Sequence, residues 1–289
     1  MSWVNSLVQG VLLGGLLALF ACGLSLLFGV MEVINLAHGA VAVAAGYLAV
    51  VLIPDLHLPA IWSFVVVVPV FALGGYLLQR GLLQPSLDAS PLTTLLVTFG
   101  LAIVIQNLLL EAFTANSYSL NVGSLVSSAF VVTSQLSIAY LSLVILGAAL
   151  VVLAGLQLFL SRTRTGRIIR AVADDREAAQ LVGADYRHIF GIAAALAFGS
   201  VALAGLSLAT YSQIDPTAGS NYLVYAFEAV VIGGLGSLWG TLVGGIVLGI
   251  ATTVGLQVSP NFGALGPHLV FLAVLAVRPR GLFPRRAIA

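Results

Sequence analysis

A few polar side chains lie inside long apolar stretches of this sequence, where they could shield a polar molecule from lipid. Asn35 and His38 fall where one apolar stretch ends and the next begins, Gln106 and Asn107 lie inside another, and Glu228 lies inside a later one. Polar groups at membrane depth are costly, so they line a cavity, pair with one another or do chemical work. We therefore predict that these five residues line a path for a small polar solute. The alternative, that they only hydrogen-bond neighbouring helices, stays open.

The sequence does not contain the residue patterns that enzymes and metal sites need. All 11 basic residues are arginine, so there is no lysine for a nucleotide-binding P-loop or for a Schiff base. There is one cysteine, no H-E-x-x-H motif, and no cluster of cysteines or histidines that could hold a metal. We expect no catalytic residue, no metal site and no cofactor in this chain.

The composition indicates a membrane protein. Hydrophobic residues make up 60% of the 289 residues and charged residues only 7%, and the mean hydropathy is +1.13. Soluble domains carry about 25% charged residues, and a membrane-spanning helix needs about 20 mostly apolar residues. Runs without Asp, Glu or Arg cover residues 1–31, 60–79, 92–110, 116–161, 189–212 and 229–277. We predict one all-α polytopic membrane domain over residues 1–289, with about eight or nine membrane segments.

Glycines mark two places where the membrane helices are expected to break. Gly29 and Gly39 flank the polar residues near Asn35, and Gly233, Gly234 and Gly236 form the second place. Glycines four residues apart also let helices approach closely in lipid. This spacing occurs at Gly10, Gly14, Gly236, Gly240, Gly244, Gly245 and Gly249.

The arginines are confined to three places, and this predicts how the chain crosses the membrane. Six lie between Arg162 and Arg187, four lie between Arg278 and Arg286, and Arg80 is the eleventh. Cytoplasmic loops carry an excess of Arg and Lys, so we expect all three places, including the tail of residues 278–289, to be cytoplasmic. The first helix then starts outside, and residues 54–59, 111–135 and 211–221 form external loops.

One stretch of the expected cytoplasmic loop 161–188 is suited to water rather than to lipid. Six charged residues lie among the sixteen from Arg170 to Asp185. Asp174 and Asp175 suit the start of a short helix, where acidic groups meet the positive end of the helix dipole, and Gly183 suits its end. A helix this short is not stable alone in water, so it lies on the lipid surface or docks on a partner. A solvated loop is the alternative.

The same stretch resembles part of a known transporter family. Glu177-Ala178-Ala179, followed after three residues by Gly183, resembles the E-A-A-x-x-x-G core of the permease subunits of ABC importers. "GLSLLFGVMEVINLAHGA", "FEAVVIGGLGSLWGTLVGG" and the tail "RPRGLFP" are similar to the branched-chain amino acid permeases, and N-L-A-H-G is similar to the shorter, H-type member. The I-x-L-P that often follows the core is absent, but the resemblance covers nearly the whole chain.

The resemblance implies one subunit of an ATP-driven importer in the inner membrane of a bacterium. It implies a coupling helix that docks on a cytoplasmic ATPase, with the residues Asp174, Asp175, Glu177, Ala178, Ala179 and Gly183. The implied partners are a second permease subunit or second copy, two ATPase subunits that hold ATP and Mg²⁺, and an external substrate-binding protein. No nucleic acid is implied. The solute would be a branched-chain amino acid or a related small polar molecule.

Two other kinds of membrane protein stay open at this point. A secondary transporter or channel would also have broken helices and buried acidic residues, but it would need no docking helix for an ATPase. A purely structural membrane subunit would need no helix breaks. A bound ATPase is expected only for the importer subunit.

Overall fold

The computed structural model describes residues 3–56, 61–123, 128–133 and 136–283. The longer helices are α1 (Trp3–Met31), α2 (His38–Leu56), α3 (Ile61–Leu78), α5 (Pro91–Phe113), α7 (Tyr140–Arg162), α10 (Tyr186–Tyr211), α11 (Gly219–Gly233), α12 (Leu238–Val258) and α13 (Pro260–Val277). The shorter elements are the π-helix η1 (Gln79–Leu83), α4 (Gln84–Ala89), α8 (Arg164–Asp174), α9 (Arg176–Leu181), and the strands β1 (Ala129–Thr133) and β2 (Leu136–Ala139).

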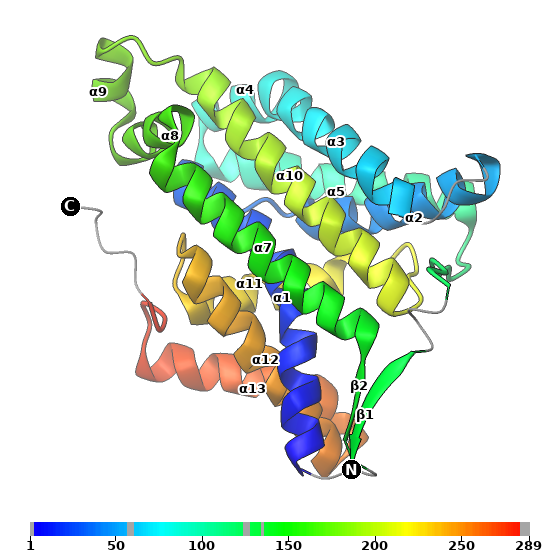
Figure 1. The fold of residues 1–289 in the computed structure, drawn as a ribbon. Coiled ribbons are helices and arrows are strands. Elements are labelled where there is room, and N and C mark those ends of the chain that lie inside the picture. The colour runs from blue at the N-terminus through cyan, green and yellow to red at the C-terminus, as the bar shows by residue number, and fades with distance from the viewer. Residues whose placement is uncertain (1–2, 57–60, 124–127, 134–135, 284–289) are drawn as a thin grey trace.

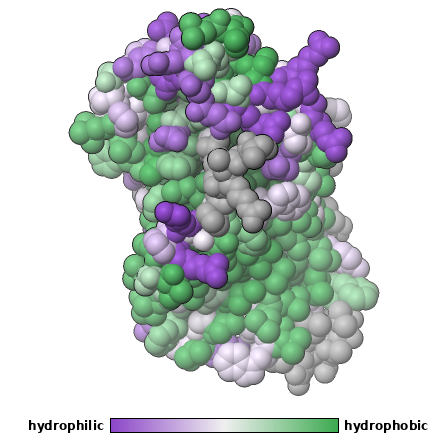
Figure 2. Space-filling view, turned by 90° about the vertical axis from the view of Figure 1, so that its left-hand side faces the viewer, coloured by the Kyte–Doolittle hydropathy of each residue, from purple (hydrophilic) through white to green (hydrophobic). Residues whose placement is uncertain are grey.

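The helices form one bundle (Figure 1). Seven of the described segments are long and apolar enough to cross a membrane, with α3, η1 and α4 counted as a single segment. The predicted number of eight or nine membrane segments is therefore only approximate. Figure 2 shows hydrophilic residues gathered at the end of the molecule that carries α8 and α9, and a broad apolar surface below them. The predicted all-α polytopic membrane fold is confirmed.

Helices α1 and α10 form the centre of the bundle, and α5 and α13 lie at its edge. In the apolar 18-residue stretch of each helix, 83% of α1 and 78% of α10 is buried, compared with only 11% of α5 and of α13. The outer helices therefore present apolar faces that must contact lipid or another subunit.

Helix α1 packs against α12 through the repeated glycines. Gly10 and Gly14 of α1 face Ile250 and Ile246 of α12, and Gly249 of α12 faces Gly10 in return. A Cβ atom at any of these glycines would collide with the backbone of the other helix. The absence of side chains lets the two backbones touch, as the four-residue spacing predicts.

Helices α2 and α11 begin inside the bundle rather than at its ends. The Nε2 atom of His38, the first residue of α2, donates a hydrogen bond to the carbonyl oxygen of Phe20 at 2.7 Å. Phe20 lies in α1, eleven residues before the helix ends at Met31, or about 16 Å along its axis. Gly39 of α2 touches Gly219 of α11 so closely that neither has room for a Cβ atom. The two helices therefore start side by side, part of the way along α1.

The break between α1 and α2 does not use the expected glycines to bend the chain. The helix ends at Met31, and the chain turns at the exposed Glu32, whose φ angle is 56°. Gly29 lies inside α1 and Gly39 inside the first turn of α2. These two glycines serve close packing instead, because Gly29 faces Gly236 and Gly39 faces α11.

The second helix break lies at the glycines where the sequence predicted it. Helix α11 ends at Gly233, and α12 begins at Leu238. Gly234 and Gly236 between them have φ angles of 106° and 79°, which side chains other than glycine rarely adopt. Chain reversal at this point therefore depends on glycine.

The described parts of the loops assigned by the arginine pattern to opposite sides lie at opposite ends of the bundle. Residues 57–59, 124–127 and 134–135 of the expected external loops, and residues 284–289 of the tail, lie outside the described residues. At one end, Tyr118 and Ile214 pair their backbones, and they come from two of the expected external loops. At the other end, Arg80 lies 3.7 Å from Asp185 of the expected cytoplasmic loop. The antiparallel hairpin of β1 and β2 lies beside the start of α1, where Gln9 donates to the carbonyl of Ser137 at 2.7 Å. This hairpin is an element that the hydropathy pattern did not predict.

Candidate functional site

Asn35 and His38 are both buried in the break between α1 and α2. The side-chain oxygen of Asn35 accepts a hydrogen bond from the backbone N–H of Ala37 at 3.0 Å. The N–H of Leu36 donates to the hydroxyl of Thr98 in α5 at 3.2 Å, which ties the break to that helix. The Nδ2 atom of Asn35 and the Nδ1 atom of His38 are buried without a partner. Burying a polar atom without a hydrogen-bond partner is costly. Because each of these two atoms lacks a partner, each can bond a water molecule or a solute.

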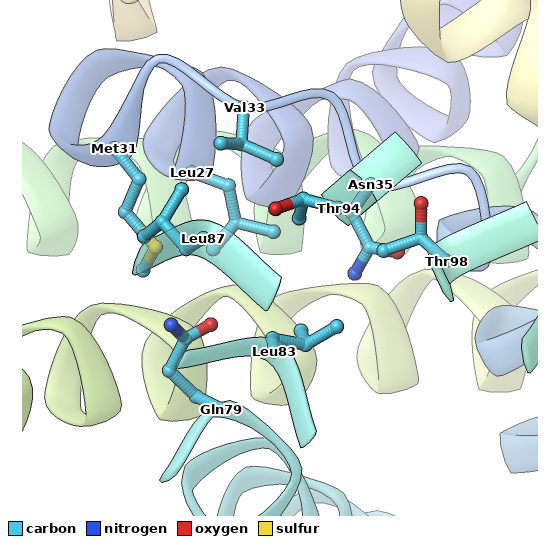
Figure 3. A pocket seen from close by; sticks show the side chains of 9 residues that line it. All are labelled: Leu27, Met31, Val33, Asn35, Gln79, Leu83, Leu87, Thr94 and Thr98. Carbon is cyan, nitrogen blue, oxygen red and sulfur yellow. The ribbon is translucent and has the colours of Figure 1, made fainter. Parts of the chain in front are cut away.

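A small cavity lies under this break (Figure 3). In the close-up, Asn35 and Thr98 lie on one side of it and Gln79 and Leu83 lie on the other. The remaining lining residues are Leu27, Met31, Val33, Leu87 and Thr94. Its volume is about 20 Å³, enough for one water molecule, which needs roughly 10–15 Å³. In this conformation it has no room for an amino acid.

Glu228 forms a hydrogen-bonded pair with His268 within the membrane helices. Its carboxylate oxygen Oε1 lies 2.6 Å from Nδ1 of His268, so α11 and α13 are joined by a short hydrogen bond. The imidazole of His268 also stacks on the ring of Tyr225, with centroids 5.6 Å apart. The second carboxylate oxygen, Oε2, is buried and has no partner. The sequence did not indicate this pairing, because forty positions separate the two residues.

Gln106 and Asn107 lie apart from this pair, on the outer helix α5. Gln106 is half-buried, and Asn107 is exposed with its amide donating to the carbonyl of Ile103 at 2.8 Å. Asn107 thus bonds its own helix, Asn35 bonds the backbone of the break, His38 bonds α1 and Glu228 bonds α13. The structure does not gather the five predicted residues into one pocket. Their assignment to a transport path stays a prediction.

The charged stretch folds as two short helices that meet at Asp175. Asp174 is the last residue of α8, not the start of the next helix as expected. Asp175 caps α9, because its carboxylate accepts the N–H of Ala178 at 2.9 Å. At the other end, the N–H groups of Gly183 and Ala184 donate back to the carbonyls of Gln180 and Ala179. Gly183 has a φ angle of 89°, so it ends α9 in the way that a helix-terminating glycine does.

The side chains of α9 divide into an inner and an outer set. Ala179 is 4% exposed and packs against the body of the chain, so it is not available to a partner in this conformation. Glu177 and Ala178 are exposed. Leu181 and Val182, at the end of the helix, are 89% and 85% exposed. The apolar side chains of this segment therefore point two ways: Ala179 inward, and Leu181 and Val182 outward.

Two charged residues outside the loop 161–188, Asp88 and Arg80, pair with residues at the start of α9 and α10. Asp88 of α4 lies 3.3 Å from the guanidinium of Arg187 and 3.9 Å from that of Arg176. Arg80 pairs with Asp185, the residue that caps α10. The only signal in the sequence was that charged residues are rare outside the loop 161–188 and the tail. It could not identify partners about a hundred positions away.

A family match covers nearly the whole chain. Residues 6–277 match the family described as the branched-chain amino acid transport system permease component. The matched range includes both helix breaks, α9 and the Glu228–His268 pair.

Individual relatives are similar over almost their full length. The chain is 31% identical to BraD of Pseudomonas aeruginosa, a high-affinity branched-chain amino acid transport system permease, over 98% of this chain and 96% of the relative. It is 28% identical to LivH of Escherichia coli over the same shares. A probable branched-chain amino acid permease of Methanocaldococcus jannaschii is 27% identical over 94% of this chain and 90% of the relative.

Proposed function

Because the chain belongs to the branched-chain amino acid transport permease family, we propose that it carries branched-chain amino acids or a related small polar solute inward across a bacterial plasma membrane. It acts with a second permease subunit, which is a related chain or a second copy. Two ATPase subunits bind ATP and Mg²⁺ and supply the energy, and an external binding protein delivers the solute. The names of the relatives support the choice of solute.

The observation that carries the proposal is the outer side of α9. Leu181 and Val182 are almost fully exposed at the tip of a helix that is capped at both ends. Burying each of them on a partner would contribute about 1.5–3 kcal/mol. A short, rigid, apolar tip beside the exposed Glu177 suits a groove on an ATPase subunit.

The proposal places the α9 end in the cytoplasm. Arg80 and the six arginines from Arg162 to Arg187 belong to this end, and the tail packs near it, where Leu282 donates its N–H to the carbonyl of Ile232. The positive-inside rule then sets the direction of every crossing. The second permease subunit covers part of the exposed apolar surface of the outer helices, and lipid covers the rest.

Co-purification of the assembled complex tests this function. The parent chain, Leu181→Asp and Leu181→Met are expressed with their ATPase subunits and purified through a tag on the permease. We expect the parent and Leu181→Met to retain the ATPase and Leu181→Asp to lose it, since only Asp places a charge in the apolar contact. Retention of the ATPase by Leu181→Asp, with normal transport, would contradict docking at α9.

A further inference from the structure

The segment that follows α3 contacts the start of α9 and the first turn of α10. Figure 1 shows α4 at the same end of the molecule as α8 and α9. Arg80 of η1 pairs with Asp185 at 3.7 Å, and the hydroxyl of Tyr76 lies 2.8 Å from Nδ1 of His188. These contacts join α3 and η1 to the first turn of α10.

Asp88 is the central acceptor of this contact. Its Oδ2 atom lies 3.3 Å from Nη2 of Arg187, and its Oδ1 atom lies 3.9 Å from Nη1 of Arg176. The hydroxyl of Tyr186 lies 3.3 and 3.5 Å from the two oxygens. Arg176 is the first residue of α9, and its guanidinium also lies over the ring of Tyr186, 5.1 Å from the centroid. Asp88 thus holds the residue at which α9 begins.

A line of amide side chains leads from Asp88 back into the bundle. The Nε2 atom of Gln84 donates to Oδ1 of Asp88 at 2.9 Å, and the Nε2 atom of Gln79 donates to Oε1 of Gln84 at 3.4 Å. Gln79 and Gln84 are 2% and 4% exposed. Gln79 lines the cavity under Asn35 and belongs to the π-helix, a form often found at functional positions (Figure 3). Polar contacts therefore run from the start of α9 to Gln79, which lies across the cavity from Asn35 of the α1–α2 break.

We propose that Asp88 is a positioning residue that transmits the movement of α9 to the α1–α2 break through Gln84 and Gln79. This inference rests on the proposed function, in which an ATPase docks on α9. When the ATPase moves α9, Arg176 pulls on Asp88, and the π-helix takes up the displacement next to Asn35. The carboxylate is 30% exposed, and exposed ion pairs contribute little to stability. Its role is therefore to fix orientation rather than to hold the fold.

The test uses the complete complex in vesicles, with ATPase subunits and binding protein, and measures solute transported per ATP hydrolysed. We expect Asp88→Asn to keep the ATPase bound and the melting temperature unchanged, while transport per ATP falls at least fivefold. Asp88→Glu, which keeps the negative carboxylate that pairs with the two arginines, should restore most of the ratio. Glu111→Gln, an exposed acid at the opposite end of α5, serves as the charge-matched control and should leave the ratio unchanged.

A second route breaks the same contact from its other side. Arg176→Gln with Arg187→Gln should lower transport per ATP to a similar degree, and adding Asp88→Asn should cause no further fall, because all three act through one contact. An unchanged ratio in Asp88→Asn, or loss of the ATPase from that variant, would overturn the proposal. If Leu181→Asp releases the ATPase while Asp88→Asn transports normally, α9 docking stands and only the role of Asp88 is lost.

Discussion

The carboxylate of Glu228 and the imidazole of His268 lie 2.6 Å apart and join two membrane helices that are distant in the sequence. The Glu228 side chain is buried, whereas that of His268 is 40% exposed on the outer helix α13. One carboxylate oxygen has no partner, so the pair can accept one more hydrogen bond from a solute, a water molecule or a neighbouring subunit.

Substitutions at Glu228 and His268 distinguish a role of this pair in transport from a role in helix packing. Glu228→Gln keeps the size of the side chain but replaces the carboxyl group with a neutral amide. If the pair lines the path, transport should slow several-fold at near-normal expression and ATPase docking. His268→Leu leaves Glu228 without a partner, so we expect it also to lower stability, by about 1–3 kcal/mol. Normal uptake by both variants, measured with radiolabelled solute, would show that the path runs elsewhere.

Gly39→Ala should destabilise the protein because α2 and α11 touch at Gly39 and Gly219. The added methyl group has no space between the two backbones, and overpacking of this kind costs about 1–3 kcal/mol or more. Gly74→Ala in α3 is the matched control, since nothing lies within 4 Å of the position where its Cβ would be. Thermal unfolding in detergent should show a lower melting temperature for Gly39→Ala alone.

Asn35→Leu should impair both the helix break and transport. It removes the acceptor for the N–H of Ala37 and fills the cavity with an apolar side chain. We expect a loss of about 1–2 kcal/mol in stability from the missing hydrogen bond, with slower uptake. Asn35→Ser keeps a short acceptor and should fall between Asn35→Leu and the parent chain. Parent-like uptake and melting temperature in Asn35→Leu would exclude this residue from the path.

Ala179→Glu should disturb the packing of α9 against the bundle, whether or not a partner is bound. Ala179 is packed inward, so the substitution places an unpaired carboxylate in the contact between α9 and the bundle, at a cost of several kcal/mol. We expect α9 to become accessible to protease and transport to fail, while Ala178→Glu, on the exposed side, leaves α9 protected. Equal protease resistance in both variants would contradict the inward position of Ala179.

The purified chain should neither bind nor hydrolyse ATP. A P-loop needs a lysine, and all 11 basic residues here are arginine. Phosphate release from the isolated permease should not exceed the background measured with detergent alone. It should rise when the ATPase subunits are added. Hydrolysis by the isolated permease, after removal of contaminating ATPases, would disprove this.

The amino-acid sequence alone was enough to predict features that depend on local composition. Long apolar runs predicted the membrane helices, and the arginines predicted which loops share an end of the bundle. The short charged helix could also be predicted, because its caps use groups only a few residues away: Asp175 bonds the N–H of Ala178, and Gly183 closes the last turn. The glycine spacing predicted close packing of helices, though not which helices would meet.

Only the tertiary structure decided which distant residues became partners. Glu228 meets His268 forty positions away, and Asp88 meets Arg187 across ninety-nine. These pairings depend on how each helix is rotated about its axis and where along the bundle it begins, as α2 and α11 do at Gly39 and Gly219. Packing of whole helices sets those rotations, and in chains that are apolar on every face the hydrophobic pattern does not show which face turns inward. On the short helix α9, contact with the bundle buries Ala179 and leaves the more apolar Leu181 exposed, which hydropathy alone does not predict.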